Sequence, residues 1–186
     1  PVSVPEPGRI AIHRARFRAG IAPVGPDAPV DTASSLLRHA GCVTTTYADY
    51  RALKWSKLLL NLPGNALCAI LDWLPAQVMA NEVSARLEAR AWQEAFRVLA
   101  ALRIRPVTLA RYALPLLAPL ARVLPPGLLA RALAGTVAGG RGTKLPSLLM
   151  ALNAGGRSEV SWLNGAVVRA GRAAGVWLAR PQAVVA

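Results

Sequence analysis

The sequence predicts a mainly α-helical protein whose first segment is a short piece of α/β structure. Leu and Ala are abundant, whereas the chain has only 2 Phe and 3 Tyr, a composition typical of helical proteins. From about residue 47 onward apolar residues recur at helical spacing, while the first 45 residues alternate between strand-like and loop-like patterns. A chain of 186 residues that is 54% apolar can bury a core and is not expected to be disordered.

Two strand-like patterns flank a loop in the first 45 residues. Residues 9–17 alternate apolar and polar side chains, as a half-exposed strand does, and residues 42–47 are rich in β-branched side chains. Residues 20–29 are rich in Gly and Pro and are expected to form a loop.

A short helix is expected between this loop and the second strand. Asp31 or Thr32 can cap its start, and it should run through Arg38 and end near Gly41. The order strand, loop, helix, strand is a piece of α/β architecture, and we expect residues 1–46 to be the end of a larger α/β domain.

Long amphipathic helices are expected next, over residues 48–71 and 75–102, with Pro75 in a first helical turn. Residues 108–138 are apolar but contain several prolines, which predict short helices with breaks between them. These prolines stand at positions 115, 119, 125 and 126.

The last part of the chain predicts a glycine loop and two further helices. Residues 139–142 should form the loop, and residues 147–153 a short helix. Ser158 can cap a final helix that runs to about Ala174 and stops at Gly175.

The net charge of +13 restricts the possible partners without identifying one. Nineteen of the 22 basic residues are Arg, and they are scattered rather than gathered in a stripe with aromatic residues, as a nucleic-acid-binding surface would require. A solvated basic surface or a site for an anionic ligand fits the pattern better. A basic helical module that binds nucleic acid or an anionic membrane remains the alternative, and DNA affinity falling steeply with salt would support it.

The chain shows no sign of secretion or of a membrane span. Cys42 and Cys68 suggest no disulfide framework, the first residues do not resemble a signal peptide, and the longest uncharged apolar stretch, residues 58–71, is too short to cross a bilayer. We therefore expect a cytoplasmic protein.

Lys57, Asn61 and Asn65 stand four residues apart among leucines. In a helix this spacing turns the side chain by only about 40° per step, so the three would form one polar stripe. A Lys in such surroundings is costly unless it meets an anion or a polar cavity. The alternative is a Lys that extends to solvent and two amides that cap neighbouring turns. Pro63, between the two Asn, should kink the segment.

Two further polar residues are candidates for a site. Glu159 is the single acidic residue after Glu94. It is either a functional group of a site or a negative charge that interacts favourably with a helix start. Ser147 is either a ligand-binding group or the cap of its own helix. The chain contains no phosphate-binding glycine motif, and His13, His39 and Cys42 have no metal-ligand spacing, so no metal is expected.

Two blocks of this sequence resemble the C-terminal domain of the ketopantoate reductases, which are 2-dehydropantoate 2-reductases. The first is W-x-K-L-x-x-N-x-x-x-N at residues 55–65. The second is Pro146-Ser147, then Glu159 twelve residues after the Ser, followed by LNGAVVR at residues 163–169. The blocks occur in the family's order, and the likeness extends over most of the chain.

This resemblance implies a helical C-terminal domain of the 6-phosphogluconate-dehydrogenase-like type at residues 47–186, behind the end of a Rossmann domain at residues 1–46. It implies NADPH, bound mainly by Rossmann-domain residues that this chain does not contain, a small 2-oxo acid as substrate, and a possible homodimer. By position, Lys57 would be the general acid, Asn61, Asn65 and Ser147 would bind substrate, and Glu159 would assist catalysis and lie near the cofactor. A reductase of another 2-oxo acid, or an inactive fragment, is the alternative.

Overall fold

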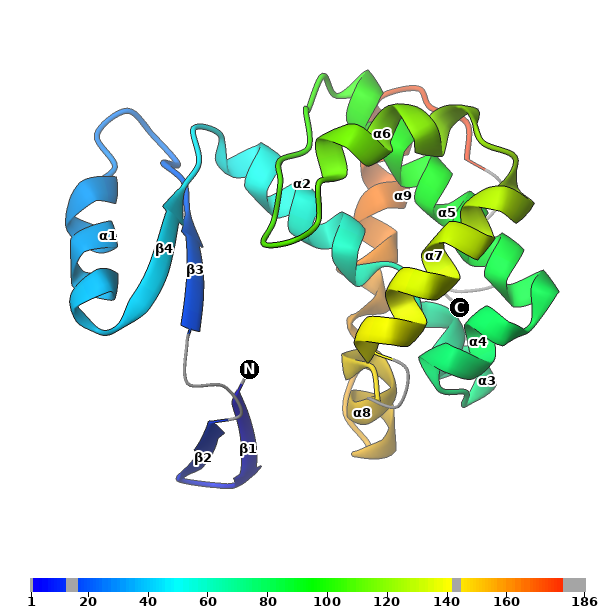
Figure 1. Ribbon diagram of the computed structural model, residues 1–186, viewed down its shortest axis with the longest axis horizontal. Helices are drawn as coiled ribbons and strands as arrows, with labels where there is room; N and C mark the ends of the chain where they lie inside the picture. The colour runs from blue at the N-terminus through cyan, green and yellow to red at the C-terminus, as the bar shows by residue number, and fades with distance from the viewer. Residues whose placement is uncertain (1, 13–16, 142–144, 179–186) are drawn as a thin grey trace. The chain divides into compact units, whose positions relative to one another are not determined.

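The computed structural model describes residues 2–12, 17–141 and 145–178 of the chain. Its Cα positions separate into two compact units, Pro1–Leu53 and Lys54–Ala186, with the boundary inside helix α2 (Tyr50–Asn61). Each unit is described by itself below, and Figure 1 gives the labels of the elements.

The first unit begins with a two-stranded antiparallel hairpin, β1 (Val2–Glu6) and β2 (Arg9–Ile12). Gly8 has a φ of 81°, a conformation that glycine adopts readily in a tight turn. The sequence did not predict β1. The strand predicted over residues 9–17 corresponds to β2 and to the first residue of the next strand, and its residues 13–16 lie outside the described residues.

The rest of this unit is one β-α-β element with two parallel strands. β3 (Phe17–Ile21) pairs with β4 (Cys42–Thr46), and α1 (Val30–His39) connects them, which is the crossover that parallel strands require. The order strand, loop, helix and strand occurs here, but its first strand is β3, which shares only Phe17 with the strand predicted over residues 9–17 and includes Gly20 and Ile21 of the predicted loop.

The predicted cap of α1 is wrong. The cap position is Pro29, two residues before Asp31, and no side chain caps the helix, which begins at Val30. Asp31 therefore lies in the first turn, where its negative charge interacts favourably with the helix dipole.

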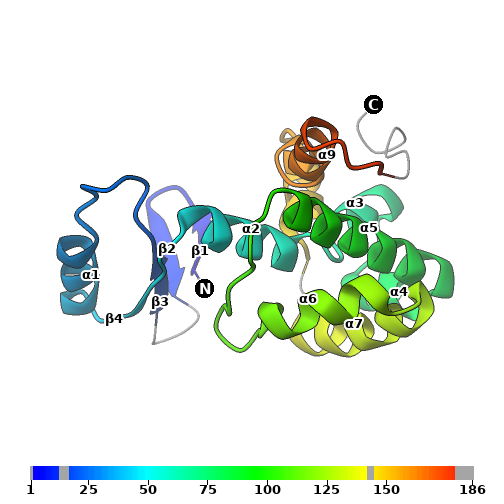
Figure 2. The same cartoon turned by 90° about the horizontal axis from the view of Figure 1, so that it is seen from above.

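The second unit is a bundle of helices around α5, the longest of the described helices (Figure 1, Figure 2). The other elements are α3 (Ala66–Leu71), α4 (Pro75–Ala80), α5 (Glu82–Ala101), α6 (Leu114–Val123), α7 (Pro126–Arg141), α8 (Ser147–Asn153), the 3₁₀ helix η1 (Glu159–Ser161) and α9 (Asn164–Ala173). α5 packs against α4, α6, α7 and α9. The predicted mainly helical class is confirmed, and none of the described helices is long and apolar enough to cross a membrane.

Trp92 joins α5 to α2 in the core of this unit. Its indole Nε1 donates a hydrogen bond of 2.8 Å to the Leu59 carbonyl oxygen, and its ring meets Phe96 edge to face with centroids 4.9 Å apart. Ser56 on α2 is fully buried and accepts a 2.8 Å hydrogen bond from the Val107 amide. These buried polar contacts hold α2, and with it Lys57, in a fixed position on the bundle.

Two long predicted helices are each divided in the structure. The segment 48–71 breaks after Asn61, as Pro63 indicated, and resumes as α3. The segment 75–102 is α4 followed by α5, because Asn81 leaves the helical conformation and its side chain accepts hydrogen bonds from the Val83 and Ser84 amides.

The region 108–141 is more regular than its prolines and glycines predict. Pro119 lies inside α6 rather than at a break, and α7 continues through Gly139 and Gly140 to Arg141. The predicted loop at 139–142 is therefore wrong up to Arg141, and Gly142 lies outside the described residues. Each helical glycine costs about 1 kcal/mol, and the apolar face that α7 buries against α5 and α4 outweighs this.

The helices predicted over residues 147–153 and 158–174 are only partly confirmed. The helix at Ser147–Asn153 is confirmed as α8. Ser158 caps the 3₁₀ helix η1 instead of one continuous helix, accepting a 3.2 Å bond from the Val160 amide, and α9 begins separately at Asn164. Gly175, with a φ of 67°, follows α9 as expected.

Candidate functional site

Lys57 lies on the exposed face of α2, three residues after the boundary between the two units. Its ammonium group forms no hydrogen bond or ion pair with any residue that the structure describes. The buried residues Ser56 and Leu59 on either side of it anchor the same helix in the core. A fixed stem with a free, solvated cation suits a group that meets an anionic ligand.

The polar stripe predicted on one continuous helix does not form. α2 ends at Asn61, and the chain passes through a turn before Asn65, which precedes α3. Asn65 is only 5% exposed, its Nδ2 donates a 2.6 Å bond to the Asn61 carbonyl oxygen, and its Oδ1 is buried without a partner among the described residues. Lys57 and a half-buried Asn61 therefore share a face of α2. Asn65 instead contacts the end of that helix through its hydrogen bond to the Asn61 carbonyl oxygen.

Gly64 explains why the turn between the two Asn tolerates a Pro-Gly pair. Its φ is 72°, a left-handed conformation that side chains disfavour. Its backbone amide lies near the carboxyl group of Glu88 on α5 and acts to lower the pKa of that carboxyl group. The turn that follows Asn61 thus lies against a buried acid of the core.

Glu88 is a polar residue that the sequence analysis overlooked. It is 5% exposed, and burial raises the pKa of its carboxyl group to about 7, although the nearby Gly64 amide acts in the opposite direction. The pKa of the buried thiol of Cys68 is raised to about 12 by burial and, secondarily, by the charge of Glu88. Glu88 stands four residues before Trp92 on α5, and both are buried. Because residues four apart share a face of a helix, this spacing indicates in the sequence that Glu88 lies on the buried face.

Ser147 and Glu159 both lie at the exposed starts of short helices. Ser147 is the first residue of α8 and does not cap it, since Pro146 holds the cap position without a side-chain bond. α8 packs against α3, which brings Ser147 into the same part of the bundle as the turn after Asn61. Glu159 begins η1, and neither side chain bonds to another part of the described chain. No direct contact joins them to Lys57 in the described residues.

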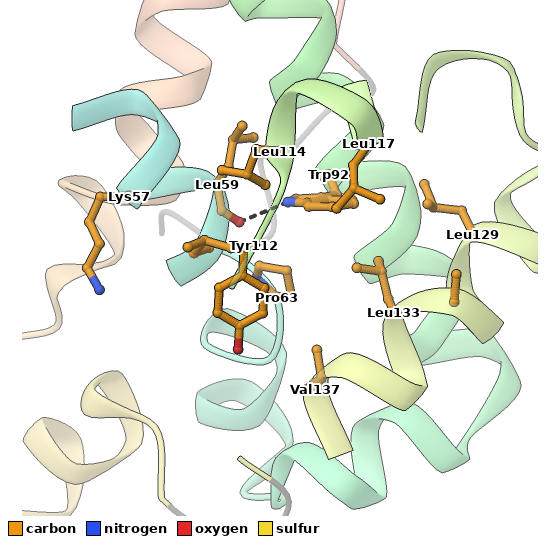
Figure 3. A pocket seen from close by; sticks show the side chains of 12 residues that line it. Lys57, Leu59, Pro63, Trp92, Tyr112, Leu114, Leu117, Leu129, Leu133 and Val137 are labelled. Atoms are coloured by element: carbon orange, nitrogen blue, oxygen red, sulfur yellow. Dashed lines mark hydrogen bonds between the residues drawn. The ribbon is translucent and has the colours of Figure 1, made fainter. Parts of the chain in front are cut away.

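An apolar pocket of about 170 Å³ opens beside Lys57 (Figure 3). Figure 3 shows Lys57 on α2 at one edge, with side chains of α7 across from it and Tyr112 and Pro63 between them. The lining residues are Lys57, Leu59, Leu60, Pro63, Trp92, Tyr112, Leu114, Leu117, Leu129, Ala132, Leu133 and Val137. Neither Tyr112 nor this pocket is predicted from the sequence, because the walls of the pocket come from four separate segments.

The described residues do not fit a complete dinucleotide site. A Rossmann site needs a glycine-rich turn between a strand and a helix, where backbone amides receive the pyrophosphate. The β3–α1 connection, residues 22–29, contains a single glycine, Gly25, and carries no such turn. No cluster of three or more metal-ligating side chains occurs in the described part of the chain.

The comparison with family models decides the relationship. The model described as "Ketopantoate reductase PanE/ApbA C terminal" matches residues 49–186. The chain belongs to the ketopantoate reductase family. No match was found among curated proteins.

Solved structures share this fold at low sequence identity. A PanE/ApbA family ketopantoate reductase from Ralstonia eutropha JMP134 has a TM-score of 0.74 and 24% identity, over 95% of this chain and 51% of its own. D-mandelate dehydrogenase in complex with NADH has a TM-score of 0.73 and 19% identity, over 96% and 55%. The 2-dehydropantoate 2-reductase from Geobacter metallireducens GS-15 has a TM-score of 0.68 and 21% identity, over 98% and 55%. The chain therefore spans about half the length of these three proteins.

Proposed function

We propose that residues 1–186 are the substrate-binding part of an NADPH-dependent 2-oxo-acid reductase. The observation that carries the proposal is the free ammonium group of Lys57, held on a rigid helix of a ketopantoate reductase C-terminal domain, at the edge of a pocket. The family's name points to 2-dehydropantoate as substrate, and another 2-oxo acid is the alternative. Residues 1–46 are proposed to be the end of a Rossmann domain and residues 47–186 the helical domain.

Lys57 is proposed to donate the proton that the ketone oxygen needs when the 2-oxo acid becomes a 2-hydroxy acid. A general acid of this kind contributes about 10²–10⁴-fold to the rate, and its positive charge also stabilises the developing alkoxide. The surrounding positive charge of the chain attracts an anionic acid. No other described residue at the pocket carries a cation.

Polar residues around Lys57 are proposed to hold the substrate. We propose that Asn61 and Ser147 bind its carboxylate, and that Glu159 at the start of η1 assists catalysis and lies near the cofactor. Asn65 acts through its bond to the Asn61 carbonyl oxygen, which fixes the end of α2. The nicotinamide cofactor is proposed to bind mainly to residues outside this chain, and a homodimer and a cytoplasmic location complete the proposal.

Kinetics of the full-length natural protein that contains residues 1–186 test this role. Lys57→Ala should lower kcat by about 10²-fold or more with a much smaller change in KM, because the lost interaction forms mainly in the transition state. Lys54→Ala is the matched control, since Lys54 is exposed on the same helix but does not line the pocket. Unchanged turnover in Lys57→Ala would remove Lys57 from the role of general acid.

A further inference from the structure

We propose that the helical unit carries a second binding site, whose ligand is an organic phosphate: a phosphate group attached to an apolar body. The site is a pocket of about 620 Å³ formed by α5, α6 and the segment that connects them, residues 102–113. This volume lies within the range of about 300–1,000 Å³ that is usual for small-molecule sites. The pocket shares no lining residue with the one beside Lys57, so the proposal does not depend on the proposed reductase function.

Three arginines line this pocket, two from the connecting segment and one from α6: Arg103, Arg105 and Arg122. All three are exposed, and none of them forms a hydrogen bond or an ion pair with any residue that the structure describes. No acidic side chain is among the lining residues, and residues 95–158 contain no Asp or Glu. A concave surface lined by cations alone concentrates positive potential and therefore favours an anion.

The remaining lining residues make the pocket apolar behind these arginines. Phe96, Leu99 and Ile104 line it as buried side chains. Pro106 and Pro115 also line it and keep part of their apolar surface exposed. A free inorganic anion would leave this surface in contact with water, whereas an apolar body attached to the anion would cover it. The ligand that fits therefore combines an anionic group with an apolar part.

The number of cations favours a phosphate over a carboxylate. A carboxylate carries a single negative charge, whereas a phosphate monoester carries about −1.5 to −2 at pH 7 and has three strong acceptor oxygens. The guanidinium group of an arginine is a planar fork of donors that binds phosphate through two parallel hydrogen bonds. Three arginines in one pocket supply both the charge and the donors that such a group needs.

Arg103 stands at a backbone position that favours glycine. Its φ is 55°, in the left-handed region that side chains disfavour. It closes α5 in a Schellman motif, in which its amide donates a 3.0 Å bond to the Ala100 carbonyl oxygen and the Ile104 amide donates a 2.9 Å bond to that of Leu99. Glycine would form the same motif with less strain. The backbone thus gives no reason for an arginine here, and a role of its side chain in the pocket supplies one.

Isothermal titration calorimetry of the full-length natural protein tests the ligand class. The probe is 1-naphthyl phosphate, compared with inorganic phosphate, which lacks the apolar body, and with 1-naphthoate, which carries one negative charge. We expect the probe to bind with a Kd at least about tenfold lower than that of either comparison ligand, because it alone engages the three arginines and the apolar surface together. A comparison ligand that binds as tightly as the probe, or a probe that does not bind, would overturn the proposal.

Arg122→Ala tests the location of the site. Its Kd for 1-naphthyl phosphate should rise at least about tenfold, because a charged hydrogen-bond donor to the phosphate is lost. Arg172→Ala is the matched control: Arg172 is also an exposed basic residue in the last turn of its helix, α9, but it does not line the pocket. Equal changes in the two variants, or no change in either, would place the binding elsewhere and overturn the assignment.

Arg103→Gly separates binding from stability. Glycine adopts the left-handed conformation without strain, so the Tm of this variant should equal or exceed that of the wild type. Its Kd for 1-naphthyl phosphate should nevertheless rise at least about tenfold. An unchanged Kd would assign Arg103 to the end of α5 alone and would overturn its place in the site.

Vesicles distinguish a soluble organic phosphate from a lipid headgroup, which has the same chemistry. Exposed apolar side chains of α6, among them Leu116 and Val123, make a lipid surface the competing source. We expect 1-naphthyl phosphate to bind in solution and the protein not to sediment with phosphatidylcholine vesicles that contain phosphatidic acid, because a lipid in a bilayer keeps its apolar body out of the pocket. Sedimentation that Arg122→Ala abolishes, together with no binding of soluble 1-naphthyl phosphate, would overturn the proposal of a soluble ligand.

Discussion

At the scale of single residues, Glu88 shows how a buried acid supports an exposed site. Its carboxyl group lies near the Gly64 amide in the turn after α2, and the same turn contains Asn65, whose Nδ2 donates a hydrogen bond to the Asn61 carbonyl oxygen. With a pKa of about 7, Glu88 is a buried acid that stays protonated through mildly acidic pH. Its position connects the core of the bundle to the residues proposed to bind substrate.

The raised pKa of Glu88 predicts how the unfolding free energy depends on pH. Between about pH 4.5 and 7 the unfolded chain releases this proton while the folded protein keeps it, so the unfolding free energy should fall as pH rises and level off above 7. The full contribution is on the order of 3 kcal/mol. Glu88→Gln should remove it, so the variant should gain stability relative to the wild type as pH rises through this window.

Urea unfolding at several pH values measures this effect. Glu82→Gln is the matched control, because Glu82 begins the same helix but is 73% exposed in its side chain. A stability difference between Glu88→Gln and the wild type that stays constant from pH 4.5 to 7 would contradict the prediction.

At the scale of elements, the division between α4 and α5 depends on one side chain. Asn81 accepts hydrogen bonds of 3.1 Å from the Val83 and Ser84 amides, which would otherwise lack partners at the helix start. The sequence predicts one helix over residues 75–102, because the apolar spacing continues across the break. Periodicity reports the buried face of a helix and not the backbone conformation at a cap.

Asn81→Ala should therefore cost about 1 kcal/mol, with a fall in Tm of roughly 2–4 °C for a chain of this size. Thermal unfolding followed by circular dichroism measures it. Asn153→Ala, at the exposed end of α8, removes the same amide without a cap bond and should leave Tm nearly unchanged. Equal shifts in the two variants would show that the Asn81 cap contributes nothing specific.

At the scale of the whole molecule, the chain has the C-terminal domain of the ketopantoate reductase family, and its described residues contain no glycine-rich phosphate-binding turn. Purified residues 1–186 should not bind NADPH in a fluorescence titration, because no glycine-rich turn receives the pyrophosphate. The full-length natural protein is the positive control and should bind it. Clear, saturable binding by residues 1–186 alone would contradict the proposed division of the site.

Sequence patterns predicted the helical class and the short α/β segment, and two motif blocks indicated the family. Apolar spacing, β-branched runs and the positions of Lys57, Ser147 and Glu159 are local properties that can be read along the chain. Local signals failed where packing outweighed them. Pro119 lies inside α6, and Gly139 and Gly140 lie inside α7, whose burial against α4 and α5 exceeds the cost of two glycines.

The surroundings of Lys57 arise from tertiary packing and cannot be predicted from the local sequence. The turn at Gly64 breaks the polar stripe, Asn65 is buried, and α5 contributes a buried acid, Glu88, near this turn. The walls of the apolar pocket come from segments up to 80 residues apart along the chain, between Lys57 and Val137. Such a pocket has no signature in the sequence, because its chemistry arises when buried faces of different helices meet and each face, read separately, indicates only a core.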